Sequence, residues 1–474
     1  MLVVGGVIGS GIFRKAGVMM HELGSPWLLL GVWLLAGTIT YIGVLANAEI
    51  ASIIPETGGL YAFFHRIYGP FMAFLFGWAA FVVVQTGSIA ALAYVFTEYG
   101  TQFVHLPEAG PNLAAWTFHL PFIGDIAPFR DLGVKLVASG VIIFLTVINY
   151  LGAKIGAFTQ NVVTIAKLLG MALLAVIVFL PNSGGSPANF APSQTIHKEG
   201  FALVVAIVAA LQGAFWAYDG WMKVSFVAGE VRDAQRVVPR ASVIGMAIVT
   251  LVYLIMSAAY CWVLPADVMA GSKLVAADAA ERALPNGGKW IALLVMISTF
   301  GANNAVVLTS ARVYFSMARR SAFPAFLGRA HPRFHTPGAA LAAQCIWGVV
   351  LVFSGTFDML TDTLIFVAWI FYAASAAGVF VLRKRDPDAQ RVFKVPGYPI
   401  LPGIFVLFAA AFVGLTVYND ITAYRAAHAA GKPALINSAL GASLVLLGTP
   451  IYFLCRKKGA TLPKYPDRPV ALER

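Results

Sequence analysis

The sequence contains little cysteine and little charge. Of its 474 residues only three are cysteines, Cys261, Cys345 and Cys455, and each lies inside an apolar run. Buried free cysteines behave as small hydrophobic residues, so we expect neither disulfides nor a metal site. Charged residues make up 11% of the chain, against about 25% in soluble proteins. A soluble fold of this length would need more polar surface than the sequence supplies.

Several signatures of catalysis and nucleotide binding are also absent. The chain has no Walker A, HExxH or CxxC motif. The glycines between Gly6 and Gly11 follow no strand and sit in no βαβ unit, which excludes a dinucleotide loop. No cluster of Asp, Glu or His reaches the middle of an apolar run, so the sequence does not predict an enzyme. It contains no filter repeat or charge ring of an ion channel. We expect no cofactor and no nucleic-acid partner.

Long apolar runs dominate what is present. Hydrophobic residues make up 59% of the chain, and its mean hydropathy is +0.80. Runs of about 20 residues can cross a bilayer core. The sequence therefore predicts an all-α polytopic membrane protein of about twelve helices. The expected spans are 1–18, 26–53, 70–102, 132–151, 156–181, 200–230, 240–264, 288–319, 338–355, 358–383, 399–419 and 437–455.

The net charge of +12 is distributed unevenly over the predicted loops. Basic residues concentrate in alternate loops and in the tail after residue 455, whereas the opposite loops mix a few, Arg14 and Lys15 among them, with acidic residues. Cytoplasmic loops of membrane proteins carry an excess of Lys and Arg. We therefore expect both termini in the cytoplasm, in a cell (inner) membrane, and an even number of helices.

The first apolar run contains a predicted helix break. Its sequence Ile8-Gly9-Ser10-Gly11-Ile12-Phe13 places a serine between two glycines in mid-membrane. Unpaired backbone groups are tolerated at that depth only where they line a cavity or bind a ligand. The alternative is a small-residue helix contact through Gly6-x-x-Gly9. Because this run is short, we expect the native amino terminus and the start of the first helix to precede Met1.

A second break is expected in the sixth helix. The run Ala214-Phe215-Trp216-Ala217-Tyr218-Asp219-Gly220-Trp221 carries an Asp-Gly pair among apolar residues. Breaks in helices one and six occupy corresponding positions of two five-helix halves. Because each half crosses the membrane an odd number of times, the two halves have opposite orientations in the membrane. Paired breaks of this kind indicate a transporter's binding site. We expect a carboxylate at the amides near Ser10 and Gly11, and an ammonium at the carbonyls of Trp216, Ala217 and Tyr218.

Lys167 is the charged residue placed deepest in a predicted span. It lies about eleven residues into helix five, near the membrane midplane, where an unpaired lysine costs several kcal/mol. It can replace a coupling cation or carry a proton. The structural alternative is a hydrogen bond to the broken backbone of helix one. Glu49 and Glu230 lie near cytoplasmic helix ends, where they can join Arg232 or Arg236 in a gate, but an interfacial position alone explains them and is the preferred interpretation.

These motifs carry a family resemblance over nearly the whole chain. Gly9-Ser10-Gly11-Ile12-Phe13 resembles the signature of the amino acid–polyamine–organocation (APC) transporters. Further stretches resemble its L-type amino acid transporter branch and, within it, bacterial serine/threonine exchangers. They are Ala48-Glu49-Ile50, Pro55-Glu56-Thr57-Gly58-Gly59, Ala217-Tyr218-Asp219-Gly220-Trp221, Gly229-Glu230, Val238-Pro239-Arg240, His331-Pro332-Arg333-Phe334 and Lys394-Val395-Pro396-Gly397-Tyr398-Pro399.

The resemblance implies a five-plus-five inverted repeat of the LeuT type and alternating access. It implies that Lys167 stands where sodium-coupled relatives hold sodium, and that no disulfide-linked heavy chain is needed, since the loop 105–131 has no cysteine. The expected parts are a first repeat at 1–183, a second at 200–383, two further helices at 399–455 and a cytoplasmic tail at 456–474. The expected substrate-binding residues are Ile8, Gly9, Ser10, Gly11, Ile12, Gln85, Ser88, Trp216, Ala217, Tyr218, Gly220 and Asn304.

The function expected from these features is secondary transport of small neutral L-amino acids, through sodium-independent exchange. A proton-coupled symporter is the nearest alternative and differs in whether Lys167 loses its proton. A further alternative is a carrier of larger neutral or cationic amino acids. The candidate contact for a cationic substrate is Asp219. Trp216, which replaces the branch's usual Phe over the substrate, favours a small pocket.

Overall fold

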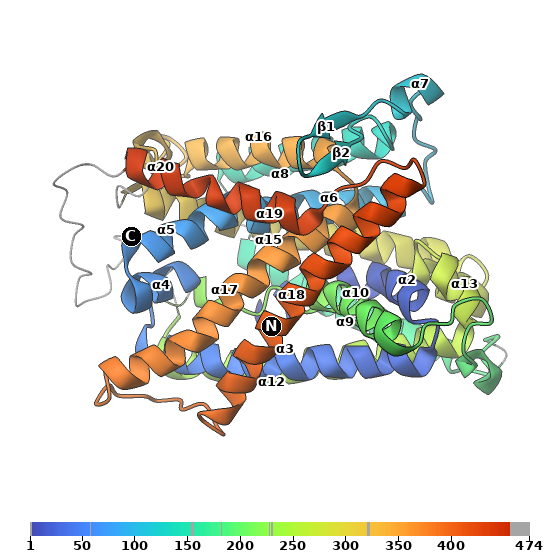
Figure 1. Cartoon of the computed structure of the whole chain (residues 1–474), viewed down its shortest axis with the longest axis horizontal. Coiled ribbons are helices and arrows are strands. Elements are labelled where there is room, and N and C mark those ends of the chain that lie inside the picture. The colour runs from blue at the N-terminus through green and yellow to red at the C-terminus, as the bar shows by residue number, and fades with distance from the viewer. Residues whose placement is uncertain are drawn as a thin grey trace.

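The chain folds into a bundle of helices, most of which run in the same direction across Figure 1. The structure is a computed structural model, and it describes residues 2–56, 58–152, 156–181, 183–226, 228, 231–319 and 323–455. Thr57, Gly229, Glu230 and the tail at 456–474 lie outside the described residues. Within the described residues, the one sheet is a two-stranded hairpin. The expectation of an all-α polytopic membrane protein is confirmed.

The helices are joined by connections of different length. Their bounds are α1 Leu2–Val7, α2 Gly11–Leu23, α3 Pro26–Ile53, α4 Leu60–Tyr68, α5 Pro70–Ala79, a π-helical turn η1 Ala80–Val84, α6 Gln85–Gly100, α7 Pro111–Ala114, α8 Leu132–Leu151, α9 Gly156–Val178, α10 Gly200–Tyr218, α11 Lys223–Phe226, α12 Ala234–Val263, α13 Ala266–Gly271, α14 Val275–Ala283, α15 Gly287–Arg319, α16 Gly338–Ser354, α17 Phe357–Arg385, α18 Ile400–Ala429, α19 Asn437–Leu446 and α20 Gly448–Cys455. Short 3-10 turns lie at Pro187–Phe190 and Ala325–Gly328.

Nine helical stretches of the described residues are long and apolar enough to cross a membrane. Two shorter apolar helices, Thr164–Val178 and Gly338–Ser354, accompany them. Helix α8 has an outer surface suited to lipid. Its strongly apolar side chains Leu136, Ile143 and Phe144 are 49–55% exposed. In a soluble protein such side chains would be buried, whereas lipid tails accept them without cost.

Most expected spans agree with the helices, and the differences have local causes. Helix α18 ends at Ala429, ten residues beyond the expected end at 419. Its additional turns contain the polar residues Asp420 and Tyr424. Asp420 is 7% exposed and accepts a hydrogen bond from the backbone amide of Ser438, 2.7 Å away, which stabilises a carboxylate at that depth. The two long polar connections contain secondary structure that the sequence did not predict. The stretch 105–131 contains α7 and the hairpin of β1 (Phe118–Leu120) and β2 (Gly124–Ile126), and 265–289 contains α13 and α14.

Close helix packing depends on small residues, as expected for a bundle in lipid. A Cβ at Gly37 of α3 would lie 2.6 Å from Thr250 of α12, and one at Gly170 of α9 would lie 2.2 Å from Leu294 of α15. Helices α17 and α18 cross the others obliquely in Figure 1. Helix α17 packs on α3, α6, α10 and α18, so it contacts the helix in which the second break is expected.

Candidate functional site

The first expected break is present between α1 and α2. The helix stops at Val7, the three residues Ile8 to Ser10 connect the segments, and α2 begins at Gly11. Ser10 precedes α2 without a side-chain capping bond. The first amides of any helix have no intrahelical partner, and they form the positive end of its dipole. The start of α2 therefore offers donors to an anionic group.

The second expected break ends α10. Asp219 is extended and Gly220 has a φ of +99°, after which the short α11 begins at Lys223. A φ in this left-handed region favours glycine, which explains the Asp-Gly pair read from the sequence. The amide of Asp219 donates to the Trp216 carbonyl at 3.2 Å. The carboxyl end of α10 presents carbonyls and the negative end of its dipole.

The two breaks lie against each other. The Trp216 indole Nε1 donates to the Ser10 hydroxyl at 3.3 Å. A Cβ at Gly11 would lie 2.3 Å from the Cα of Ala217, so only glycine permits this approach. Ser10 is 1% and Trp216 is 7% exposed. The donor end of α2 and the acceptor end of α10 thus face each other in a closed, buried arrangement.

Two side chains bind the carbonyls at the end of α1. Lys167 of α9 is 1% exposed, and its Nζ donates to the carbonyls of Gly5 at 2.8 Å and Ile8 at 2.5 Å. The hydroxyl of Tyr253, on α12, lies 3.1 Å from the Val7 carbonyl and 2.8 Å from that of Ala217. Both breaks are therefore joined through one tyrosine. The ammonium of Lys167 thus satisfies two backbone carbonyls at the end of α1.

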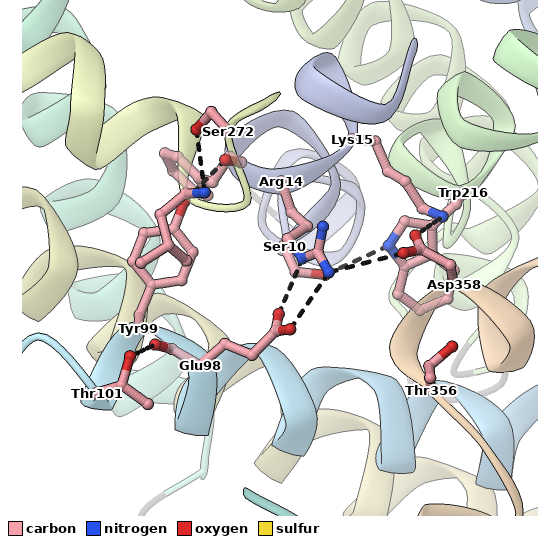
Figure 2. A network of polar contacts seen from close by, with 12 residues as sticks. Ser10, Arg14, Lys15, Glu98, Tyr99, Thr101, Trp216, Ser272, Thr356 and Asp358 are labelled. Atoms are coloured by element: carbon pink, nitrogen blue, oxygen red, sulfur yellow. Dashed lines mark hydrogen bonds and ion pairs between the residues drawn. The ribbon is translucent and has the colours of Figure 1, made fainter. Parts of the chain in front are cut away.

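A cluster of charged residues follows the first break directly. Arg14 and Lys15 of α2 are 6% and 1% exposed, and Figure 2 shows Arg14 between Glu98 and Asp358. The guanidinium contacts Glu98 at 2.8 Å and Asp358 at 3.6 Å. Lys15 contacts Asp358 at 2.7 Å and Asp362 at 3.6 Å. The expectation that Arg14 and Lys15 belong to a loop is wrong, because α2 continues through them and acidic partners on α6 and α17 compensate their charge.

Phe357 links this charged cluster to the break in α10. Its ring lies 6.0 Å from that of Trp216 in an edge-to-face arrangement. The same ring lies 5.0 Å from the Arg14 guanidinium and 4.9 Å from the Lys15 ammonium. Edge-to-face aromatic pairs and cation–π contacts are each worth roughly 0.5–2 kcal/mol. Trp216, the candidate lid residue, is therefore packed against a residue that also contacts both cations.

Comparisons with known proteins identify the family of this chain. The family model described as "Amino acid permease" matches residues 1–438. The serine/threonine exchanger SteT of Bacillus subtilis (strain 168) is 32% identical over 464 residues, which cover 97% of this chain and 96% of the relative. This chain belongs to the amino acid permease family. It is a multi-pass membrane protein of the APC superfamily, on its L-type branch, and its relatives transport amino acids.

Two human proteins also match most of the length of this permease. The b(0,+)-type amino acid transporter 1 is 29% identical over 413 residues, or 87% of this chain and 80% of the relative. The large neutral amino acids transporter small subunit 2 is 29% identical over 456 residues, or 96% of this chain and 78% of the relative. The similarity thus extends over both breaks and over most of the helices.

The remaining expected site residues of the permease lie on neighbouring helices. Gln85 is the first residue of α6, directly after the π-helical turn η1. Ser88 of α6 is buried, and its hydroxyl donates to the Val84 carbonyl at 2.9 Å. Asn304 of α15 accepts a hydrogen bond from Asn149 of α8 at 2.7 Å. Helix α6 reaches the first break, since a Cβ at Gly9 would lie 3.8 Å from Leu92.

Glu49 has different partners from those considered on sequence grounds. It is 1% exposed and receives two hydrogen bonds from Arg383, at 2.8 and 2.7 Å, and one from the Val395 amide at 2.8 Å. Arg391 lies 3.4 Å away. Glu49 therefore connects the end of α3 with the end of α17, and its carboxylate is buried between these helices. Glu230 lies outside the part of the chain that the structure describes.

Sequence reasoning missed Tyr253 and the acidic partners of Arg14 and Lys15. Tyr253 lies in an apolar helix and resembles any other buried aromatic residue, so no local signal marks it. The charged cluster did carry a signal. Two cations stand four and five residues after Ser10, next to an apolar run, and a charge in that position requires partners if the helix continues. Only the fold shows that Glu98 and Asp358 supply them.

Proposed function

We propose that this permease exchanges small neutral L-amino acids, serine- or threonine-like, across the membrane by alternating access without sodium. The observation that carries the proposal is the meeting of opposite half-helix ends at Ser10–Gly11 and Trp216–Ala217. A zwitterion carries one anionic and one cationic group a few ångströms apart, and these two ends complement them. A simple anion or cation would satisfy only one end.

The carboxylate is assigned to the first break and the ammonium to the second. The amides at the start of α2, next to Ser10, supply donors for the carboxylate, with Ile8, Gly9 and Ile12 forming the surrounding backbone. The last carbonyls of α10 accept from the ammonium. Those of Trp216 and Ala217 already accept one hydrogen bond each, and a carbonyl oxygen retains a second lone pair. Tyr218 and Gly220 complete this side.

A small side chain fits the closed geometry best. Gly11 packs directly on Ala217, and Trp216 lies over Ser10, so little volume remains near the α-carbon position. A bulky substrate would have to displace the indole, whereas serine or threonine requires a smaller movement. The name of the bacterial relative, a serine/threonine exchanger, supports the same substrate class and the exchange mode.

Lys167 is proposed as the residue that makes the cycle independent of sodium. Its ammonium binds the α1 carbonyls permanently, so no dissolved cation has to bind and leave. The proposed architecture is a first repeat at 1–183, an inverted second repeat at 200–383 and two further helices at 399–455. We place both termini on the cytoplasmic side of a cell membrane, because loops rich in Lys and Arg are typical of that side. No disulfide-linked partner is required.

Uptake into proteoliposomes tests this function. Purified protein is reconstituted, and uptake of labelled serine is measured with and without unlabelled serine inside the vesicles. Exchange predicts uptake that depends on internal serine, saturates with external serine and does not change when sodium is removed. Equal uptake into empty vesicles contradicts exchange, and stimulation by an imposed proton gradient would favour the symporter. Absence of serine uptake in both preparations contradicts the proposed substrate.

A cationic substrate is a second candidate because of the Asp219 carboxylate beside the α10 break. Asp219 accepts a hydrogen bond from the Tyr372 hydroxyl at 2.5 Å and lines a small cavity with room for about one water, which a substrate would have to widen. Aromatic rings that surround a carboxylate favour an organic cation. The other lining residues are Thr40, Phe215, Tyr218, Trp221, Trp369 and Phe405. Lysine or arginine that competes with labelled serine, with competition lost in Asp219→Asn, would support this candidate, and no competition would exclude it.

A further inference from the structure

Several buried oxygen atoms lie where α17, α18 and α19 pack on one another, and none belongs to an expected substrate-binding residue. Four of them have no hydrogen-bond partner in the part of the chain that the structure describes: Thr363 Oγ1, Thr416 Oγ1, Asn437 Oδ1 and Ser438 Oγ. Asp420 adds a carboxylate. We propose that these five residues, the oxygen cluster, bind one alkali metal cation that joins the three helices. This binding is independent of the proposed exchange.

Asp420 and Ser438 bring α18 and α19 together. The Ser438 amide donates to the Asp420 carboxylate at 2.7 Å, so this carboxylate caps the start of α19. The Ser438 hydroxyl lies beside the same carboxylate but forms no well-aligned hydrogen bond with it. Thr416 precedes Asp420 by four residues and therefore lies on the same face of α18. Two free hydroxyls thus lie next to one carboxylate.

Thr363 places α17 at the same level. A Cβ at Gly441 of α19 would lie 3.2 Å from the Thr363 Cγ2 and 3.4 Å from its carbonyl oxygen, so the two helices are in direct contact there. Ser438 precedes Gly441 by three residues and lies on the same face of α19. Asp362, next to Thr363, is close enough to Asp420 for the two carboxylates to repel each other. The residues of all three helices therefore gather in one place.

Burial makes the free oxygens costly unless a ligand binds them. Thr363, Thr416, Asp420 and Ser438 are 0–7% exposed. A buried polar group without a partner loses its hydration and gains nothing in return. Buried hydroxyls on helices commonly donate to the carbonyl one turn earlier, as Thr146 does at 2.8 Å in this chain. Thr363 and Thr416 do not form this bond, so their hydroxyls are available to a ligand.

The charge of the oxygen cluster favours a monovalent ion. Among the described residues, no basic side chain forms an ion pair with Asp420, whereas the charge of Asp362 is compensated by Lys15, 3.6 Å away. Hard cations prefer carboxylate, hydroxyl and carbonyl oxygens. No group of three His, Cys, Asp or Glu residues in the described part of the chain suits a divalent or transition metal. One uncompensated carboxylate among neutral oxygens matches a single positive charge.

The cation would stabilise the bundle rather than drive transport. It would bind residues of three helices at once, and an ion that stays bound takes no energy from its gradient. Sodium-independent exchange is therefore compatible with this site. Asp420 lies 20 residues after Ile400, or about 30 Å along α18, and Ser438 is the second residue of α19. The oxygen cluster thus lies near the membrane face opposite the basic loop 383–394, within reach of dissolved ions.

Thermal stability and direct binding test the proposal together. Purified protein in detergent is melted in choline chloride, which is replaced stepwise by sodium chloride or potassium chloride at constant ionic strength. We expect at least one of the two salts to raise the thermal midpoint by at least about 2 °C. The salt that acts identifies the source of the ion, outside the cell for sodium or inside for potassium. Binding of radioactive sodium, or of rubidium in place of potassium, should approach one ion per chain.

Two substitutions locate the ion. Asp420→Asn retains an acceptor for the Ser438 amide and should abolish the salt-dependent rise of the midpoint. Thr416→Val replaces an unpaired hydroxyl by a methyl group, which by itself leaves stability unchanged or higher in choline chloride. If the hydroxyl binds the ion, the same change weakens ion binding by about tenfold or more.

Glu22→Gln is the matched control. It removes a carboxylate that pairs with Lys198 at 2.7 Å and that belongs to α2 rather than to the oxygen cluster. The salt-dependent rise should persist in this variant. An equal loss of the rise in Glu22→Gln would overturn the site, because any missing carboxylate would then suffice.

The remaining outcomes are equally decisive. No rise in either salt and no bound ion, in protein that is folded by gel filtration, overturns the proposal and leaves water as the occupant. An unchanged rise in Asp420→Asn places the ion elsewhere and overturns it too, as does a rise that only calcium produces. If Asp420→Asn does not fold, Thr416→Val decides. None of these measurements requires transport, so a failure of serine exchange leaves their result intact.

Discussion

Replacement of Lys167 by methionine tests the part of the site that the structure defines most sharply. The lysine donates two hydrogen bonds to the end of α1 from a buried position. A hydrogen bond from a charged group contributes about 1.5–3 kcal/mol, so the two contribute about 3–6 kcal/mol to the closed contact between α1 and α9. Methionine fills the volume of the stem without donating.

The expected result is a large loss of exchange in a folded protein. A shift of 3–6 kcal/mol corresponds to roughly two to four orders of magnitude in the population of the closed contact. Exchange of labelled serine in proteoliposomes should fall at least a hundredfold, while gel filtration still shows a single symmetric peak. The packing of α9 on α12, α14 and α15 does not depend on the ammonium, which is why folding survives.

Lys135 supplies a matched control for this experiment. It too is 1% exposed, and its Nζ donates to two carbonyls, those of Ala127 at 2.9 Å and Pro128 at 3.1 Å. These carbonyls belong to the connection before α8 rather than to a broken helix. Lys135→Met should lower thermal stability and retain most of the exchange. Wild-type exchange by folded Lys167→Met, or an equal loss in both variants, would refute the specific role of Lys167.

Three further substitutions probe other contacts of the site. Gly11→Ala places a Cβ 2.3 Å from Ala217, so serine exchange should fall at least about tenfold through overpacking, and normal exchange would show that the breaks do not need this approach. Tyr253→Phe removes one shared donor worth about 1 kcal/mol, which predicts a roughly fivefold slower exchange with an unchanged thermal midpoint. Glu49→Gln leaves Arg383 without its carboxylate and should lower the free energy of unfolding by about 1.5–3 kcal/mol in a detergent melt, whereas an unchanged midpoint would contradict a structural role for that pair.

Much of the helical framework was predictable because bilayer-spanning helices are set by local composition. The expected spans 26–53 and 132–151 coincide with α3 and α8. The two breaks were also predictable, since glycines beside a serine and an Asp-Gly pair disfavour a continuous helix wherever they occur. Lys167 donates to the Gly5 and Ile8 carbonyls, which is the contact that the structural alternative for this lysine described, and its role in coupling stays a prediction.

Contacts between distant helices could not be predicted in the same way. Arg14 and Glu98 are 84 residues apart, and Lys15 and Asp358 are 343 apart, so no sequence period relates them. The charge of Arg14 and Lys15 made a loop the simpler expectation. That expectation failed because an ion pair between helices removes most of the cost of a buried charge, and the partners are visible only after the helices have packed.

The sequence by itself determined that this chain is a bundle of membrane-spanning helices with two interruptions and one deep lysine, because hydropathy and glycine content act locally. The tertiary structure decided which ends of the broken helices meet, that Tyr253 joins them, and that three carboxylates surround Arg14 and Lys15. These features depend on the relative placement of helices far apart in the chain. Their physical origin is the cost of leaving a buried charge or hydrogen-bonding group without a partner.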